Sequence, residues 1–276
     1  MKAPALLVLV LCGGCYPWVD GRWEDYAMPD QVQVVGAAIQ LERLGGYWGD
    51  TSPEGELWWG WLSEPQAGLS ALDMLAPEGP GCARGAPDET LVTGLFEEPG
   101  ASVSVLRGPE IYELPYDELE QRFALQVDEI ATGSYDLDPV LSDAAGALEA
   151  HPFLSMPPGV PIDGPPLSGA VANEGTLEDL VFSWDASTQA ADWFGVEARI
   201  AESSPAGYVA FEWVSCLVPF SDGELSIPTA LWSDPDRAAA VYIFMGPVDE
   251  RVEQVGDRDF TASTVGVRRS AGILRL

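Results

Sequence analysis

Short runs in which apolar and polar residues alternate recur along most of the chain. In LVFSW at 180–184, the residues Leu180, Phe182 and Trp184 fall on one side of an extended backbone. Alternation with a period of two is typical of strands that bury one face. Clusters of Gly, Pro, Asp and Ser separate the runs, so the pattern predicts an all-β protein. In the first part of the chain we expect strands at 32–44, 56–62, 91–96, 102–106, 111–116, 123–130 and 135–137.

A proline-rich stretch divides these predicted strands from a second group. Residues 151–167 read HPFLSMPPGVPIDGPPL. Because proline lacks a backbone N–H and stiffens the chain toward an extended conformation, we expect a linker there. This linker would join an N-terminal β-rich module at 32–150 to a C-terminal β-sandwich at 168–276. Residues 141–150 are the best candidate for a helix, and a short one.

The second group has the size of one sandwich domain. Its runs lie at 180–184, 194–200, 208–218, 224–227, 240–245 and 261–276. An early tryptophan, Trp184, in a stretch of about 100 residues resembles immunoglobulin-like and fibronectin-type-III-like sandwiches. The resemblance implies two packed antiparallel sheets of about seven strands. Cys216 has no second cysteine in this module, so the disulfide that joins the sheets of immunoglobulin domains is not expected.

The first fifteen residues, MKAPALLVLVLCGGC, predict export. Lys2 precedes an apolar run at 5–11, which is a secretory signal pattern and too short to cross a bilayer. The end of this segment, LCGGC at 11–15, resembles the lipobox of bacterial lipoproteins, in which small residues precede a cysteine that is diacylated before cleavage. The resemblance implies that residues 1–14 are removed and that Cys15 carries the lipid. Cys12 stands where the family usually has leucine.

The lipobox resemblance also implies a location. Each buried methylene contributes about 0.8 kcal/mol, so durable anchoring takes more than one acyl chain, and a cysteine bearing palmitate and further acyl chains meets that need. Tyr16 follows Cys15 where an inner-membrane lipoprotein usually has aspartate, which favours the outer membrane over the inner membrane. Residues 15–31 are expected to be a tether.

The whole layout resembles uncharacterised acidic lipoproteins of Gram-negative bacteria. They combine a lipobox, an N-terminal β module, a proline-rich connector and a C-terminal sandwich with a segment like CLVPFSDG at 216–223. The resemblance implies no established activity.

Charge excludes one class of partner. The 276 residues contain 13 Lys and Arg against 44 Asp and Glu, for a formal net charge of −31. Proteins that bind nucleic acid need a basic surface to displace counterions from phosphates, so nucleic acid is not an expected partner. Hydrophobic residues make up 47% of the chain, which predicts a folded core rather than disorder.

Few residues are suited to catalysis. His151 is the only histidine and lies in the predicted linker. The sequence has no Gly-x-Ser-x-Gly motif, which would mark a serine nucleophile for this histidine to activate. Zinc sites need several His or Cys ligands, and only Cys82 and Cys216 remain once Cys15 is acylated and Cys12 removed. We therefore expect no catalytic residue, no metal and no cofactor.

Close carboxylates keep one enzymatic alternative open. Pairs occur at Asp136 and Asp138, Asp234 and Asp236, and Asp257 and Asp259. In a chain with 44 acids such neighbours arise by chance, and we interpret them as solvated surface. A carbohydrate-active or other exported hydrolase that uses only Asp and Glu remains the alternative function.

Three tryptophans form a candidate binding platform. In the run WWGW at 58–61, Trp59 and Trp61 would share one face of a strand and Trp58 the other. Exposed rings on one face would suit a glycan or a protein ligand. The alternative is that all three rings belong to the core.

Two further cysteines are candidates for a disulfide, one in each predicted module. Export would place Cys82 and Cys216 in an oxidising compartment, where a bridge across the linker would persist. The sequence leaves this bridge and two separately buried thiols as alternatives. Taken together, the chain is expected to be an exported, membrane-anchored lipoprotein with a non-enzymatic binding or envelope-structural role.

Overall fold

The computed structural model describes residues 31–44, 55–62, 75, 80–85, 102–118, 122–140, 153–172, 176–205, 207–254 and 259–276. These residues form strands and four 3-10 helices, η4 (Ala186–Thr188), η5 (Phe220–Asp222), η6 (Thr229–Leu231) and η7 (Pro235–Arg237). The predicted all-β class is therefore confirmed. None of the helices in this part of the chain has the length and apolar composition that crossing a bilayer requires. The strand predicted at 91–96 and the helix at 141–150 lie outside the described residues.

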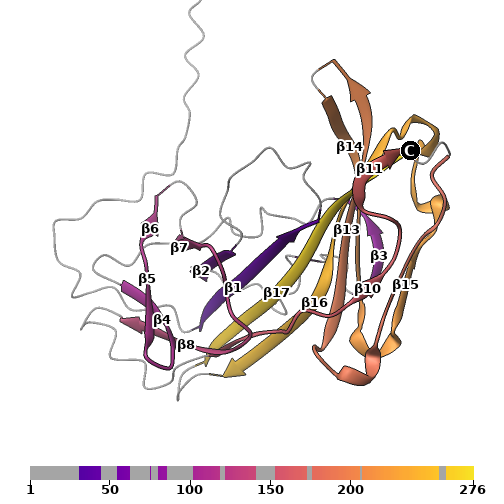
Figure 1. Ribbon diagram of the computed structural model, residues 1–276. Helices are drawn as coiled ribbons and strands as arrows, with labels where there is room; N and C mark the ends of the chain where they lie inside the picture. The colour runs from indigo at the N-terminus through magenta and orange to yellow at the C-terminus, as the bar shows by residue number, and fades with distance from the viewer. Residues whose placement is uncertain are drawn as a thin grey trace, which may run out of the picture.

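The described strands belong to three sheets (Figure 1). The large sheet contains ten strands, in the order β3 (Gly81–Arg84), β14 (Gly207–Pro219), β13 (Trp193–Ser204), β16 (Ala240–Gln254), β17 (Asp259–Arg275), β1 (Gln31–Arg43), β2 (Gly55–Leu62), β7 (Arg122–Val127) and β6 (Tyr116–Asp117), with β11 (Ser168–Ala172) also paired to β17. The N-terminal small sheet has the order β5 (Glu110–Leu114), β4 (Ser102–Arg107), β8 (Gly133–Val140) and β9 (Phe153–Met156). The C-terminal small sheet has the order β10 (Ile162–Asp163), β12 (Leu180–Trp184) and β15 (Glu224–Ile227).

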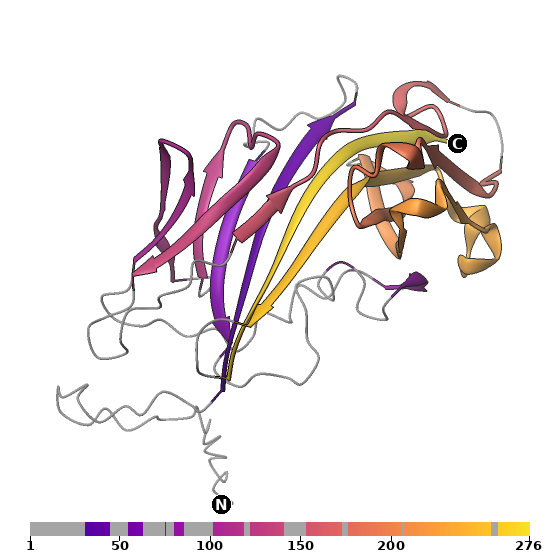
Figure 2. The same ribbon diagram turned by 90° about the horizontal axis from the view of Figure 1, so that it is seen from below.

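A long hairpin made of β16 and β17 runs through both halves of the molecule (Figures 1 and 2). Strand β13 pairs with the first part of β16, from Ala240 to Val248. Strand β1 lies parallel to β17 over thirteen residue pairs, from Gln31 opposite Asp259 to Arg43 opposite Ala271. One sheet therefore crosses the predicted boundary between modules, so the two halves are not separate modules joined only by the proline-rich stretch.

Both small sheets cover the same face of the large sheet, which we call the inner face. In β17, Leu274 belongs to the core under the C-terminal small sheet, and Gly266 pairs with Ala38 of the N-terminal core. Residues an even number apart in a strand point to the same side, so both cores lie on one face. Ala37, Val265 and Val267 point to the opposite, outer face and are also buried. Each half thus keeps a core of its own although the halves share a sheet.

The C-terminal half has the strand order of a fibronectin type III sandwich. Strand β11 pairs with β17 and is set aside; if the other seven strands from β10 onward are lettered in chain order, β10, β12 and β15 are A, B and E, and β14, β13, β16 and β17 are C′, C, F and G. In constant-type immunoglobulin domains the fourth strand joins the A-B-E sheet instead. Here the fourth strand, β14, forms a hairpin with the third, so the sandwich predicted at 168–276 is present but draws its first strand from the predicted linker.

Trp184 anchors this sandwich. Leu180, Phe182 and Trp184 are buried on one side of β12, as their alternation predicts. The Trp184 ring stacks on Phe194 with ring centroids 3.8 Å apart, and its indole N–H donates to the Phe220 carbonyl at 2.7 Å. A buried tryptophan usually needs such an acceptor, because an unpaired N–H in an apolar core is costly.

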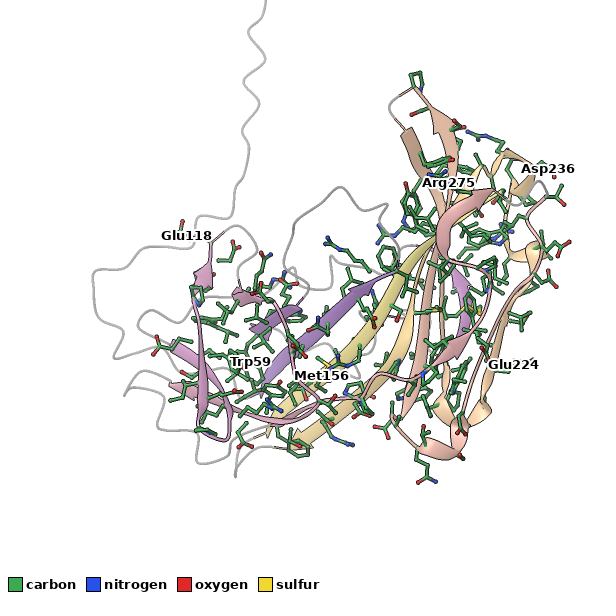
Figure 3. All side chains as sticks on the ribbon, in the orientation of Figure 1. Trp59, Glu118, Met156, Glu224, Asp236 and Arg275 are labelled. Carbon is green, nitrogen blue, oxygen red and sulfur yellow. A yellow bond between two sulfur atoms is a disulfide. The ribbon has the colours of Figure 1, made fainter. Side chains whose placement is uncertain are left out.

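The N-terminal core lies between the N-terminal small sheet and strands β1, β2 and β7. Figure 3 labels two of its members, Trp59 from β2 and Met156 from β9. Both are almost completely buried, as is Tyr135, whose hydroxyl donates to the Ala131 carbonyl at 2.8 Å.

The stretch predicted as a linker is instead part of the fold. Phe153–Met156 forms β9, with Leu154 and Met156 buried, and Ile162–Asp163 forms β10. Leu167 at its end is buried in the C-terminal core. Its apolar residues pack into both cores, Leu154 and Met156 into the N-terminal core and Leu167 into the C-terminal core, so the segment lies along the inner face as a packed strap.

Arg268 and Asp249 fasten the strap to the long hairpin. The Arg268 guanidinium donates to the carbonyls of Pro157 at 3.0 Å and Ile130 at 2.8 Å. The Asp249 carboxylate accepts from the Ser155 hydroxyl at 2.8 Å and from the Asp192 N–H at 3.1 Å. Gly266 faces this strap so closely that a Cβ atom would overlap the Ser155 carbonyl.

We expect Gly266→Ala to destabilise the protein by about 1–3 kcal/mol, because the new methyl group would push β9 away from the hairpin. The loss would appear in urea unfolding followed by tryptophan fluorescence. Gly159→Ala is the matched control, since a Cβ there would meet only the Arg268 side chain, at 3.4 Å. Equal stability of the two variants would contradict the close packing of the strap.

Candidate functional site

Several residues singled out from the sequence lie outside the described part of the chain. These are Cys15, His151, Asp257 and the side chains of Trp61, Asp138 and Asp259. Of the remaining carboxylates, Asp136 and Asp236 are exposed, and Figure 3 labels Asp236 at the periphery of the molecule. The Asp234 carboxylate forms an ion pair with Arg237, with Oδ2 of Asp234 3.7 Å from Nε of Arg237. Within the described ranges, no group of three or more His, Cys, Asp and Glu side chains could hold a metal ion.

Trp58 and Trp59 do not form an exposed platform, and this interpretation is wrong for both. Trp59 has no exposed surface and Trp58 is 3% exposed. The two rings point to opposite faces of β2, as the alternation predicts, but Trp59 enters the N-terminal core and Trp58 packs on the outer face beside Ala37 and Val265. Both faces of the large sheet are covered at this position, so a ligand has access to neither ring.

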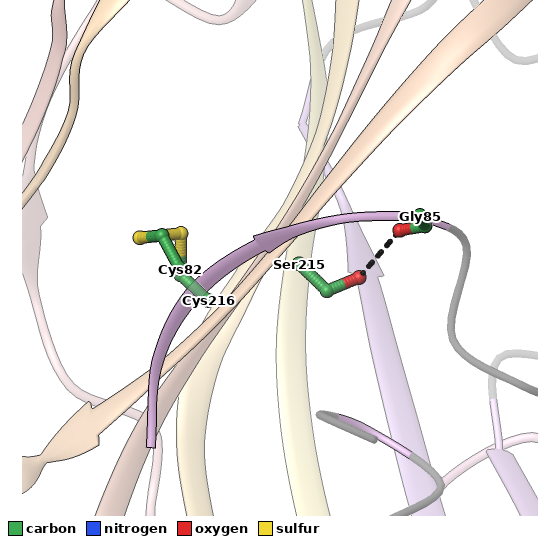
Figure 4. The surroundings of a disulfide bond; sticks show 4 residues. All are labelled: Cys82, Gly85, Ser215 and Cys216. Carbon is green, nitrogen blue, oxygen red and sulfur yellow. Dashed lines mark hydrogen bonds between the residues drawn. A yellow bond between two sulfur atoms is a disulfide. The ribbon is translucent and has the colours of Figure 1, made fainter. Parts of the chain in front are cut away.

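A disulfide joins Cys82 of β3 to Cys216 of β14 (Figure 4). The two sulfur atoms are 2.06 Å apart, and the two residues lie directly opposite each other in the antiparallel pair. Of the two alternatives that the sequence left open, the structure has the bridge. Close by, the Ser215 hydroxyl donates to the Gly85 carbonyl at 3.3 Å. A segment from the first third of the chain is thereby fixed to the edge of the C-terminal sandwich.

Arg84 extends this attachment to the loop after β15. Its guanidinium donates to the Leu231 carbonyl and to the Ser233 hydroxyl, the latter at 3.2 Å. The Glu212 carboxylate on β14 accepts from the Ser233 N–H at 2.9 Å and lies 3.9 Å from Arg84. Strand β3 therefore bridges the two sheets of the sandwich at one edge. The pattern around GCAR at 81–84 is too short to have predicted a strand.

A buried carboxylate holds two arginines on the outer face of the C-terminal half. Glu197 is 4% exposed, and its carboxylate accepts from Arg199 Nε at 2.5 Å and lies 3.5 Å from Arg269 Nη1. Burial lowers the pKa of the Arg269 guanidinium below its usual value, Glu197 opposes this shift, and the nearby charge of Arg199 adds to it. The positions of Glu197 and Arg199, two residues apart in one strand, predict a shared face, whereas only the fold brings Arg269 to them.

Aromatic residues surround this charge cluster on the same face. The Arg199 guanidinium lies 5.0 Å from the centre of the Phe244 ring, and Arg275 lies 6.0 Å from the centre of the Tyr208 ring. Arg199 lies opposite Trp213 of β14 and opposite Tyr242 of β16, so the rings of Trp213 and Tyr242 are on the same face as Arg199. The arginine–aromatic patch is our name for the set of Arg199, Arg275, Tyr208, Trp213, Tyr242 and Phe244. All its side chains are partly exposed, and aromatic residues and arginine are the types enriched where proteins meet.

Comparison with known proteins identifies no family. No family model matches the chain, and no curated protein matches it. Among solved structures, a DUF3823 family protein from Bacteroides ovatus is similar at 8% identity over 64% of this chain and 90% of that one, with a TM-score of 0.20. The FN1–FN3 domains of chicken CNTN1 match at 9% identity over 87% of this chain and 64% of theirs, with a TM-score of 0.19. A chain of a cytokine receptor complex matches at 14% identity over 66% of this chain and 88% of that one, with a TM-score of 0.22. At these TM-scores the matches carry no argument, and the fold class rests on the strands themselves.

Removing the disulfide should cost about 2–5 kcal/mol of stability, because the bridge closes a long loop and restrains the unfolded chain. The partners are 134 residues apart in sequence. We expect the double variant Cys82→Ala, Cys216→Ala to unfold at lower urea concentration than the oxidised protein. Reductant should bring the wild type to the stability of the variant and leave the variant unchanged. A wild type insensitive to reductant would contradict the bridge.

Glu197→Gln should destabilise the protein by about 3 kcal/mol, since it leaves two arginines without a buried counter-charge. Glu202→Gln is the matched control, because Glu202 pairs with Arg237 at a site where the two side chains are 42% and 51% exposed. Surface pairs of this kind contribute about 0–1 kcal/mol. Thermal and urea unfolding of the two variants measure the difference. Equal losses would show that Glu197 has no special structural role.

Proposed function

We propose that this protein is exported, anchored to a membrane through lipid on Cys15, and non-enzymatic, with a role in binding or in the structure of the cell envelope. The observation that supports export most directly is the Cys82–Cys216 disulfide. Disulfides persist in oxidising compartments and are rare in the cytosol. This agrees with the signal pattern and lipobox resemblance of residues 1–15.

The packing supports a scaffold or binding role over a catalytic one. Buried carboxylates are where an enzyme of this composition would keep its acid and base. The two that the structure describes, Glu197 and Asp249, accept hydrogen bonds from the protein's own arginine, serine and backbone groups. They hold strands together. The arginine–aromatic patch has the composition of a protein-binding surface, which favours a protein ligand over the glycan that an aromatic platform would have suited.

A lipid anchor explains how such a protein stays at a membrane. Several acyl chains on one cysteine provide durable anchoring, because each buried methylene adds about 0.8 kcal/mol. With Tyr16 after the modified cysteine, we assign the protein to the outer membrane. The acidic surface, from a net charge of −31, keeps the anchored body soluble and repels the anionic headgroups beneath it.

Metabolic labelling with palmitate in a Gram-negative host tests the anchor. We expect the wild type to take up label and to sediment with outer membranes. Cys15→Ser should take up none and lose the membrane association, because the acceptor thiol is gone. Cys12→Ser is the control and should be labelled like the wild type, since residue 12 is removed with the signal. Label retained in Cys15→Ser would overturn the proposal.

A further inference from the structure

Two arginines share one buried carboxylate on the outer face, so this cluster keeps one positive charge in excess. Glu197 is 4% exposed, and its two carboxylate oxygens lie 2.5 Å from Arg199 Nε and 3.5 Å from Arg269 Nη1. Among the described residues, Glu197 and Arg199 are the charged groups that act on the Arg269 guanidinium. A charge that is largely removed from water is costly without a counter-charge, so a second carboxylate would stabilise the cluster.

Arg269 keeps its hydrogen-bond donors available for such a group. Its side chain is only 19% exposed, yet within the described ranges it donates no hydrogen bond and forms only the ion pair with Glu197. Burial lowers the pKa of its guanidinium, because the charge is held there with little water around it. A guanidinium carries five N–H donors in a fixed plane, so the capacity of Arg269 to bind an anion is largely unused.

Arg199 presents further donors beside it. Its Nε donates to Glu197, and its guanidinium lies 5.0 Å from the centre of the Phe244 ring. In the part of the chain that the structure describes, its two Nη groups form no hydrogen bond, and its side chain is 36% exposed. A guanidinium held against a ring keeps N–H groups at its edge, where a carboxylate can accept two of them side by side.

Two other arginines concentrate positive charge on the same face. Arg275, which Figure 3 labels, lies six residues after Arg269 in β17, and Arg43 lies opposite Ala271. Both therefore share the face of Arg269. Four arginines thus gather on one face of a chain that has only 13 Lys and Arg against 44 Asp and Glu. An anionic group is attracted to this face more than to the acidic surface elsewhere.

The rings around the cluster favour a protein as the source of the anion. Trp213 and Tyr242 flank Arg199 and are partly exposed, and aromatic residues and arginine are enriched where proteins meet. A nucleic acid or an anionic membrane presents many negative charges, which the net charge of −31 repels at long range. A protein segment with one carboxylate among apolar side chains is repelled far less.

We infer that Arg199 and Arg269 bind one carboxylate of a segment of another protein, in which apolar side chains flank that carboxylate. The ligand carboxylate accepts hydrogen bonds from both guanidinium groups and completes an arrangement of two arginines and two carboxylates. The flanking apolar side chains pack on the rings of the arginine–aromatic patch. This site supplies the ligand chemistry for the proposed binding role and so rests on that role, but it is independent of the lipid anchor.

Thermal unfolding of the full chain in neutral detergent, with 3-phenylpropanoate as the probe, tests the carboxylate site. We expect the wild type to melt about 2–4 °C higher at about ten times the Kd of the probe, because a ligand of the folded state stabilises that state. The uncharged 3-phenylpropanamide should cause no shift, and this comparison needs no variant. Inorganic phosphate at matched ionic strength should also cause none.

Two variants locate the probe. Arg269→Met should lose the shift and still fold, since Glu197 keeps Arg199 as its counter-charge. Arg237→Met is the matched control and should keep the wild-type shift, because Arg237 pairs with Glu202 at an exposed site. A wild type that the carboxylate leaves unshifted, an equal shift with the amide or with phosphate, or a shift retained in Arg269→Met would overturn the inference.

Selection of short random peptides displayed on phage tests whether a protein supplies the carboxylate. We expect peptides retained by the wild type but not by Arg269→Met to carry one Asp or Glu beside apolar residues. Retained peptides without an acidic residue would overturn the inference, as would binding to phosphatidylglycerol vesicles that Arg269→Met abolishes, because a membrane would then be the occupant. Failure of these tests with normal palmitate labelling would remove this ligand and leave the anchor, whereas lost labelling with a normal shift would do the reverse.

Discussion

The parallel pairing of β1 with β17 is the constraint on which the rest of the molecule depends. It joins residue 31 to residue 259 and continues for thirteen pairs, so the first described strand is built onto the last. Strands β2, β7 and β6 then extend the sheet from β1, and the N-terminal core forms beneath them. Without this pairing the chain would be a sandwich with a long bare hairpin, and the N-terminal strands would have no sheet to join.

Close packing against the hairpin makes the two halves one structure. The strap, which runs from β9 to Leu167, passes over β17 at Gly266 and again at Gly272, where a side chain would overlap Leu167. Arg268 lies between these glycines and donates to the carbonyl of Pro157 in the strap and to that of Ile130 between β7 and β8. The disulfide-held β3 adds a further link from the N-terminal half to the C-terminal sandwich. All of these links are long-range, so loop closure must precede the contacts that stabilise it, and folding is expected to be slow.

This architecture determines which surfaces are open to partners. Both faces of the large sheet are buried around Trp58 and Trp59, so aromatic side chains there stabilise the fold. The partly exposed side chains of the arginine–aromatic patch lie in the C-terminal half. An anchor near Cys15 would attach to the other half, through residues that precede β1.

The sequence by itself determined those strands whose apolar and polar residues alternate clearly, but not β3, β9 or β10. Runs predicted at 180–184 and 224–227 match β12 and β15 residue for residue, because alternation is a local consequence of burying one face. Only the tertiary structure decided which strands pair, since backbone hydrogen bonds are the same for every residue type except proline and do not specify a partner. For the same reason the sequence could not place β1 beside β17, show that the proline-rich strap packs, or choose between a bridge and free thiols for Cys82 and Cys216. It predicted that Trp58 and Trp59 face opposite ways, but whether a face is covered depends on the elements that pack against it.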